Sequence, residues 1–318
     1  MLLLIKIKKQ MNKNYYKLFQ YLFIIICFLL ITKTILEEKE IHNIMFNVDV
    51  YKFFPAVIIS VFLILVYSQM IFRISKQTTS LDISKKKWIY IFLNSQFFDT
   101  VPFAGFIYKA VNLKKYKLEY KYFLFIYAFI FYSWIILYLF LFFIDATIIS
   151  IYFGMIKYFY ISIIFLITSL IFFFSIKVIH YFSNKLSSNF IVLLKIKELV
   201  LFTNKNLIKK NILVFIKSGT LIHILEFILY YSVINFLQLD LSFKVIFTIF
   251  FVNSFVDFFP ITPKNIGISE LISGTLMSLI GFNFTTGVLI RIFIRLSSIF
   301  ATIFLFLINN MFFLNNEK

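Results

Sequence analysis

Apolar runs of about 20 residues, the length of a helix that crosses a bilayer, recur along this chain and limit what it can fold into. The runs cover residues 15–36, 53–72, 121–144, 155–176, 212–237 and 285–309. Of 318 residues, 61% are hydrophobic and 14% are charged, against about 45–50% and about 25% in soluble domains. Too few polar groups remain to cover a surface in water. The pattern predicts an all-α polytopic membrane helix bundle, a single domain over 1–318 with about 6–8 transmembrane helices and one or two re-entrant helical hairpins.

The first apolar run could also be the apolar part of a signal peptide, because lysines precede it. No small-residue cleavage site follows residues 15–36, so we expect a retained helix. Cys27 is the one cysteine, and the three histidines are scattered. We therefore expect no metal site and no cofactor.

Loop charges orient the spans, because cytoplasmic loops are rich in Lys and Arg. Segments 1–17, 73–87 and 177–211 are basic, whereas the loops near 145–154 and 237–242 carry no Lys or Arg. The alternation predicts cytoplasmic N- and C-termini in the plasma (inner) membrane. The net charge of +18 lies mainly in the cytoplasmic segments. With no compact basic domain in the sequence, nucleic acid is not an expected partner.

Residues 88–108 are apolar enough to enter the membrane, yet both flanks are strongly basic. A full span would put one basic flank outside, whereas a re-entrant hairpin keeps both inside. A polar helix packed among other helices remains the alternative. The polar and helix-breaking residues of the segment suit a hairpin better than a lipid-facing helix; they are Asn94, Gln96, Asp99, Pro102 and Gly105.

The apolar region 243–282 is broken at Pro260, Pro263 and Gly267, and again near Gly281. The prolines stop the preceding helix, and a new helix is expected near Ile268. The region forms either two spans or a re-entrant hairpin of two half-helices. A break at membrane depth needs protein or a watery cavity around it, and its helix N-terminus would favour an anion. The alternative is a kinked helix with a loop at the membrane surface.

Ionisable residues inside apolar segments are functional candidates. His223 and Glu226 lie three residues apart on one helix face. They could form a proton relay, half a metal site or a purely structural pair. Arg291 is expected to snorkel toward the outer interface. Arg295 lies deeper and is expected to pair with Glu270, as a structural ion pair or a substrate clamp.

Two motifs resemble one family. Pro260-x-Thr262-Pro263-x-x-x-Gly267-x-x-Glu270 is similar to the P-x-[ST]-P-G-G-x-G-x-x-E signature of the lysylphosphatidylglycerol synthase transmembrane (flippase-like) family. In that family an Arg follows the signature by about 25 residues, and Arg295 occupies the corresponding position here. The resemblance covers nearly the whole chain in span order.

The upstream motif departs further from the pattern. Pro102-x-x-Gly105-x-x-x-Lys109 resembles the family's P-x-x-G-[DE]-x-x-R, with Phe106 in place of the acid and Lys109 in place of the Arg. In the second motif, Lys264-Asn265 replaces Gly-Gly. Lysine binds phosphate as a point charge, not in the bidentate way of arginine.

The resemblance implies lipid handling. In the family's fused enzymes a membrane domain moves aminoacylated phospholipid between leaflets and a soluble domain makes it; this sequence is expected to be the membrane part alone. It implies a flippase-like transporter, not an enzyme, for a phosphate-bearing phospholipid or glycolipid. Its two broken segments would meet near midplane, and a separate lipid-modifying enzyme is an optional partner. The expected headgroup-binding residues are Lys109, Asp257, Lys264, Glu270 and Arg295.

Other functions stay open. One is a membrane enzyme of glycolipid or cell-envelope lipid synthesis, for which Asp99, Asp257 and Glu270 are few and dispersed. Another is a non-catalytic accessory subunit. The sequence has no Walker-type nucleotide motif, so transport would run downhill or couple to ions or membrane potential.

Overall fold

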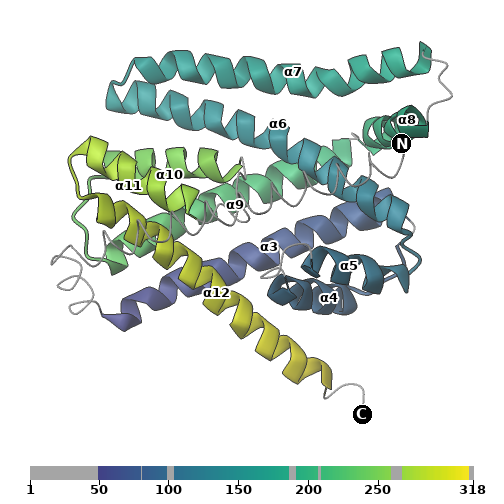
Figure 1. Ribbon diagram of the computed structural model, residues 1–318, viewed down its shortest axis with the longest axis horizontal. Coiled ribbons are helices and arrows are strands. Elements are labelled where there is room, and N and C mark those ends of the chain that lie inside the picture. The colour runs from purple at the N-terminus through teal and green to yellow at the C-terminus, as the bar shows by residue number, and fades with distance from the viewer. Residues whose placement is uncertain are drawn as a thin grey trace, which may run out of the picture. The chain divides into compact units, whose positions relative to one another are not determined.

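The computed structural model describes residues 49–79, 81–98, 104–185, 191–206, 209–258 and 267–314 (Figure 1). These ranges consist of helices and short connections, and no strand occurs within them. Five helices are long and apolar enough to cross a bilayer: α3 (Phe54–Thr78), α6 (Tyr120–Phe153), α7 (Lys157–Lys185), α9 (Lys209–Phe236) and α12 (Phe284–Leu314). The chain is a polytopic helical membrane protein, which confirms the all-α class.

The long helices overlap, in order, the predicted spans from 53–72 onward. They run past the apolar stretches, most clearly in α6, whose 34 residues extend about 50 Å at 1.5 Å per residue. Helix α6 ends at Gly154, which has a left-handed φ of 67°. The predicted span 15–36 lies outside the described residues.

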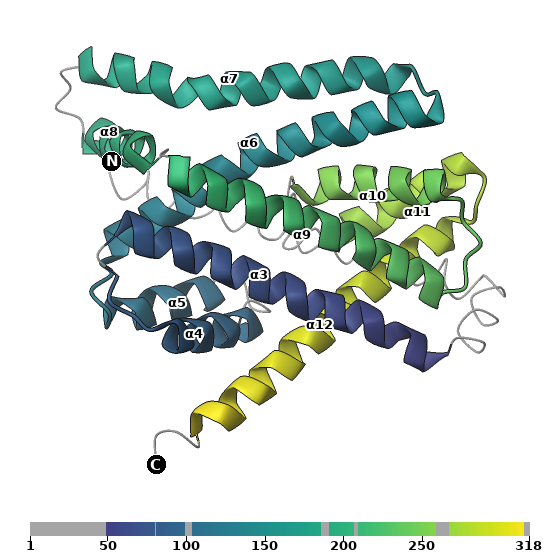
Figure 2. The same cartoon turned by 180° about the vertical axis from the view of Figure 1, so that it is seen from behind.

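Where the sequence predicts broken segments, the structure has pairs of short helices. Helices α4 (Lys85–Phe98) and α5 (Ala104–Lys114) occupy the first segment. Helices α10 (Phe243–Phe258) and α11 (Ile268–Ile280) occupy the second. The two members of each pair lie side by side (Figures 1 and 2). None of the four reaches the roughly 20 residues that a bilayer crossing needs.

The chain divides into two compact units, each described by itself. The first holds Met1–Phe54 and Tyr230–Leu296, and therefore the end of α9, all of α10 and α11, and the start of α12. The second holds Pro55–Leu229 and Ser297–Lys318. It contains the remaining helices, among them α8 (Ile191–Asn206). A 3-10 turn (Val50–Phe53) precedes α3.

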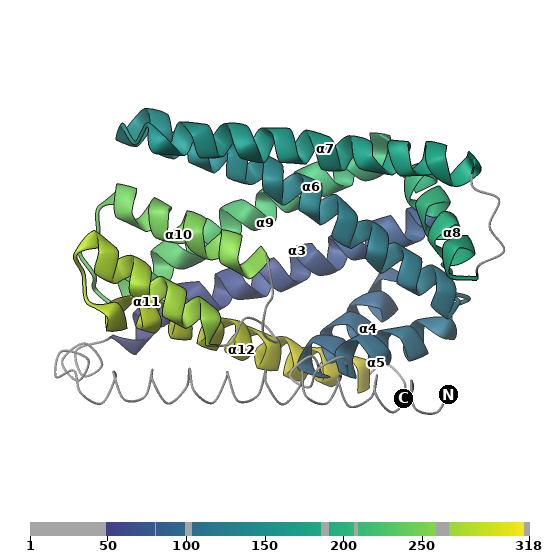
Figure 3. The ribbon, with the colours of Figure 1, turned by 45° about the horizontal axis from the view of Figure 1, so that its top comes forward.

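The second unit has a buried aromatic and aliphatic core made by α3, α4, α5 and α6. Trp88 and Phe92 of α4 and Phe123 of α6 are almost fully buried in it. The indole nitrogen of Trp88 donates to the carbonyl of Ser68 at 3.1 Å. Helices α6 and α7 lie side by side near their connection and diverge toward their opposite ends (Figure 3).

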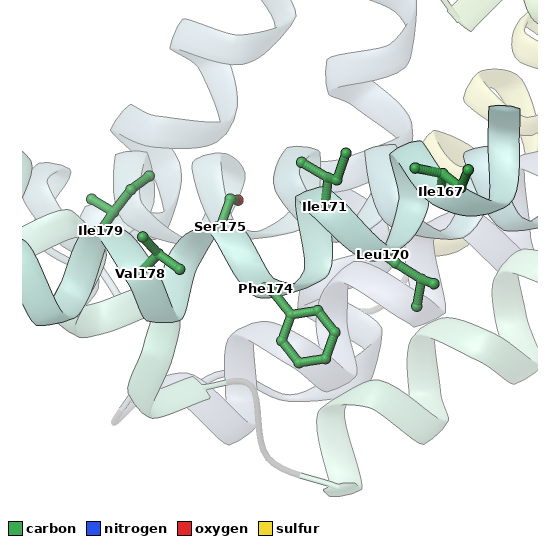
Figure 4. A pocket seen from close by; sticks show the side chains of 7 residues that line it. All are labelled: Ile167, Leu170, Ile171, Phe174, Ser175, Val178 and Ile179. Atoms are coloured by element: carbon green, nitrogen blue, oxygen red, sulfur yellow. The ribbon is translucent and has the colours of Figure 1, made fainter.

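Helix α7 has many exposed long side chains, such as Ile164 and Ile171. A shallow groove follows it (Figure 4), and every residue that lines it belongs to α7. The lining is apolar except for Ser175, whose hydroxyl donates to the carbonyl of Phe172 at 2.7 Å. Such a surface is suited to lipid acyl chains.

The first unit is tightly packed where α11 meets α12. A Cβ added to Gly287 would lie 2.2 Å from the backbone oxygen of Ser273, and one added to Gly274 would lie 2.6 Å from the ring of Phe284. Glycine is therefore needed at Gly287, where the neighbouring atom is backbone, whereas a Cβ at Gly274 would require the Phe284 ring to move. Helix α11 ends as predicted at Gly281, whose φ is 94°.

Candidate functional site

Two arginines, Arg291 and Arg295, lie one turn apart on α12, within the apolar stretch that is long enough to cross a bilayer. Residues four apart occupy the same helix face. Each guanidinium has a carboxylate partner from one of the neighbouring short helices, Asp257 of α10 or Glu270 of α11. We call these four residues, with Tyr230 and Ser269, the two-arginine site.

Arg291 is 4% exposed, and its Nη2 lies 2.7 Å from Oδ1 of Asp257. Its Nη1 donates to the hydroxyl of Tyr230, which is also buried. The prediction that Arg291 snorkels to an interface is wrong. Partners from α9 and α10 satisfy the charge inside the protein, so the side chain has no need to reach water.

Arg295 forms the predicted pair with Glu270. Its Nε contacts Oε1 of Glu270, and its Nη2 lies 3.4 Å from Oε2. The same Nη2 donates to the hydroxyl of Ser269 at 2.8 Å. Side-by-side contacts of this kind fix the orientation of both groups.

Glu270 is held from a second direction by the start of its own helix. Its Oε2 accepts the backbone N–H of Gly267 at 2.7 Å, an otherwise unsatisfied donor of the first turn. Gly267 has a φ of 85°, which favours glycine. The predicted helix start at Ile268, with Glu270 in the first turn, is confirmed. The carboxylate thus serves the helix N-terminus and Arg295 together.

Further polar side chains are buried between α10 and α11. Asn253 is fully buried, and its Nδ2 donates to the carbonyl of Ile249 at 2.9 Å and to the hydroxyl of Ser273 at 3.4 Å. The next residue in the sequence, Ser254, is also buried. These residues hold the two short helices together. Ser269, at the start of α11, bonds instead to Arg295.

Several predicted site residues lie outside the described residues, namely Pro102, Pro260, Pro263 and Lys264. Gly105 and Lys109 are both buried on α5, in the second unit. The ammonium of Lys109 lies 5.3 Å from the ring centre of Phe92 and 5.5 Å from that of Tyr127, which is cation–π range. Of the two other predicted cations of the headgroup site, Arg295 belongs to the first unit, and Lys264 lies outside the described residues.

The candidate relay residues each have a partner on α6. Nε2 of His223 lies 2.8 Å from Oδ2 of Asp145. The hydroxyl of Tyr138 lies 3.3 Å from both carboxylate oxygens of Glu226. The sequence pattern placed Asp145 in a loop beyond the span 121–144, and α6 instead continues past it. Tyr138 and Asp145 lie seven apart, on one face of a helix, which is the sequence signal for their shared role.

Metal binding has no support among the side chains of the described ranges, where no three His, Cys, Asp or Glu residues gather in a way that would hold an ion.

Fold and site together define a polytopic helical membrane protein with ion pairs inside its apolar segments. The family described as "Lysylphosphatidylglycerol synthase TM region" matches residues 18–305, and the chain belongs to this family. Membership links the protein to lipid metabolism or transport. Comparisons with curated proteins and with solved structures give no match.

Proposed function

We propose that this protein is a flippase-like transporter of the plasma (inner) membrane that moves a phosphate-bearing phospholipid or glycolipid between leaflets. The observation that carries the proposal is the two-arginine site. Two arginines of a helix long enough to span the membrane bind carboxylates at the ends of short helices of 16 and 13 residues. Interrupted helices with charged ends are typical of transporter substrate sites.

The chemistry of the site fits a phospholipid headgroup. Arginine presents a planar fork of donors that matches phosphate. In the absence of substrate, Asp257 and Glu270 compensate the two cations, which would be costly in a dry site if unpaired. A phosphate that displaces a carboxylate from its arginine would release that carboxylate for a cationic group. Asp257, with 41% of its side chain exposed, is the more accessible of the two carboxylates.

The same contacts favour transport over catalysis. A membrane enzyme that uses acid–base chemistry needs a carboxylate placed to exchange a proton with substrate. Asp257 and Glu270 are each bound to an arginine, and Glu270 also accepts a backbone N–H. This arrangement supports roles in charge compensation and positioning.

Lipid movement is measured in vesicles that contain the purified full-length protein and a phospholipid with a fluorescent headgroup or acyl-chain label. A membrane-impermeant reductant bleaches the label of the outer leaflet only. Vesicles with the protein are expected to lose the inner-leaflet signal over time, and empty vesicles to retain it. Equal retention in both would refute the proposal.

The site is tested by neutral substitutions. Glu270→Gln and Arg295→Gln each leave one buried charge without its partner, at a cost of about 3–5 kcal/mol, so a loss of transport alone would be ambiguous. The double variant Glu270→Gln/Arg295→Gln removes both charges and should insert and fold better than either single variant. It is expected to move lipid at least about tenfold more slowly than the wild type.

Matched controls are Arg73→Gln and Glu198→Gln, which make the same chemical changes at exposed positions outside the site. Both controls should transport at the wild-type rate. A double variant that folds and keeps full transport would reduce the Glu270–Arg295 pair to a structural role.

A further inference from the structure

Four titratable side chains form a continuous row in the second unit, two on α6 and two on α9. Asp145 bonds to His223 at 2.8 Å, and Tyr138 bonds to Glu226 at 3.3 Å. The rings of Tyr138 and His223 meet edge to face, with centres 6.1 Å apart, and so join the two pairs. The charged side chains that act on His223 are Asp145 from α6 and Glu226 from α9.

The row lies deep within the spanning helices. His223 is close to the middle of α9, about 20 Å from either end of this helix at 1.5 Å per residue. His223 is 6% exposed and Asp145 is 5% exposed, whereas Glu226 is only partly buried. Tyr138 is partly buried as well, so the Tyr138–Glu226 pair is the less buried half of the row.

Helix packing does not account for these residues. Gly219, one turn before His223, already lets α9 approach Leu137 and Trp134 of α6 closely. Small residues of this kind are sufficient to join membrane helices. A buried Asp–His pair adds a desolvation cost without being required for that contact. The presence of this pair in an apolar interface points to a function of the charges themselves.

We propose that the Asp145–His223 pair is a proton-binding site that couples lipid movement to the transmembrane proton gradient. The inference rests on the proposed transport function and adds its energy source. In one state the Asp145 carboxylate accepts a hydrogen bond from a neutral His223. One proton from water on one side converts this to an imidazolium–carboxylate pair, and release of the same proton to the other side restores the first state.

Glu226 and Tyr138 supply the route between His223 and the outside. Glu226 lies three residues after the histidine and is only partly buried, and the Tyr138 hydroxyl donates to it. Histidine is the side chain whose ordinary proton affinity falls in the physiological range. Since the site lies near the middle of α9, a proton that enters it crosses part of the membrane potential.

Helix α9 provides a connection to the lipid site within one element. It carries His223 and, seven residues later, Tyr230, which binds Arg291. A displacement of α9 that accompanies protonation therefore reaches a residue that contacts a headgroup-binding cation.

The test uses the reconstituted full-length protein and the labelled phospholipid of the transport assay. A pH difference of about one unit is imposed in each direction, and a pH-sensitive dye inside the vesicles reports proton entry. The readout is the ratio of the transport rate with the gradient to the rate without it. We expect a ratio of about five or more in one direction, at the lower end of usual coupling strengths, accompanied by lipid-dependent proton entry.

The variants His223→Gln and Asp145→Asn should reduce that ratio to one and abolish lipid-dependent proton entry, whereas Glu198→Gln keeps the wild-type ratio. The double variant His223→Gln/Asp145→Asn replaces the pair by two neutral amides. It is used for the same measurement if a single variant fails to insert. An unchanged ratio in any folded variant of the pair overturns the inference.

The wild-type protein separates the two proposals. Lipid movement with a ratio of one in both directions refutes proton coupling and leaves the transport function standing. No lipid movement under any gradient refutes the transport function, and the coupling inference falls with it.

Discussion

Arg291 of α12 and Asp257 of α10 form an ion pair of 2.7 Å in which only the arginine is buried: 5% of its side chain is exposed, against 41% for the aspartate. The cation is thus fixed inside the protein and the anion faces outward. A group that approaches this pair meets the carboxylate first. This asymmetry distinguishes the pair from Glu270–Arg295, in which the carboxylate is the more buried partner, 6% against 23%.

The asymmetry predicts a moderate effect of Asp257→Asn. The change leaves Arg291 with the hydroxyl of Tyr230 as a neutral partner, and Asn retains one hydrogen-bond acceptor. Loss of the charge should lower the free energy of unfolding by about 1–2 kcal/mol, less than for a fully buried pair because the aspartate is partly solvated. Thermal unfolding in detergent measures this. Asp240→Asn, at an exposed position after α9, is the control, and an equal effect of both changes would contradict the prediction.

A charge exchange at the other pair should fail to restore stability. Glu270→Arg/Arg295→Glu keeps opposite charges in contact, but places a cation at the N-terminus of α11. It also removes the acceptor of the Gly267 N–H. Both changes are unfavourable at a helix N-terminus. The exchanged protein should therefore unfold at a lower temperature than Glu270→Gln/Arg295→Gln. A higher unfolding temperature would mean that the cap contributes little.

The start of α11 shows how far local sequence determined this site. The two prolines and Gly267 predict the helix break and the new helix near Ile268, because these effects act within one turn. The bond that Glu270 accepts from the Gly267 N–H was not predicted. The Glu270–Arg295 pair was predictable because few charged residues occur in this apolar region. The motif resemblance pointed to the same two residues.

Contacts between distant helices were less predictable. The interpretation of Arg291 as a snorkelling residue was wrong, since its partner Tyr230 comes from a helix far back in the chain and carries no formal charge. Asp145 was assigned to a loop, because the predicted span 121–144 ends just before it. Its bond to His223 depends on how α6 and α9 face each other, and periodicity within either helix does not fix that.

Close packing of α11 on α12 predicts a strong effect of Gly287→Ala. The new Cβ would lie 2.2 Å from the backbone oxygen of Ser273, so the two helices would have to separate. Such overpacking costs about 1–3 kcal/mol. Separation would also displace Glu270 from Arg295, so thermal stability and lipid transport should both fall.

Gly219→Ala is the matched comparison. The nearest atom there is Cδ2 of Leu137, the end of a side chain that has other rotamers. Alanine favours a helix by about 1 kcal/mol over glycine at both positions, so the two changes differ in what the new Cβ meets. The net loss of stability should therefore be smaller than for Gly287→Ala. A larger loss at Gly219 would mean that α6 and α9 pack more rigidly than α11 and α12.

The short lengths of α4 and α5 predict that both ends of this helix pair lie on the same side of the membrane, which labelling can test. Their 14 and 11 residues extend about 21 Å and about 17 Å, less than the roughly 30 Å hydrocarbon core. If they form a re-entrant hairpin, their outer flanks face the same side of the membrane. Single cysteines are placed at Asp82 and Lys115, both exposed, in a Cys27→Ser protein. We expect a membrane-impermeant thiol reagent added to intact cells to label neither, and to label both after the membrane is opened.

A cysteine at Ile156, in the exposed connection between α6 and α7, should show the reverse behaviour and react in intact cells. Helix α6 is long enough to cross, so its two ends must face opposite sides. Lys115 lies just before α6 and Ile156 just after it, which makes each the internal control of the other. Labelling of Asp82→Cys and Lys115→Cys from opposite sides would instead mean that α4 and α5 together complete a crossing. The basic residues on one flank would then lie outside, against the charge distribution of the other loops.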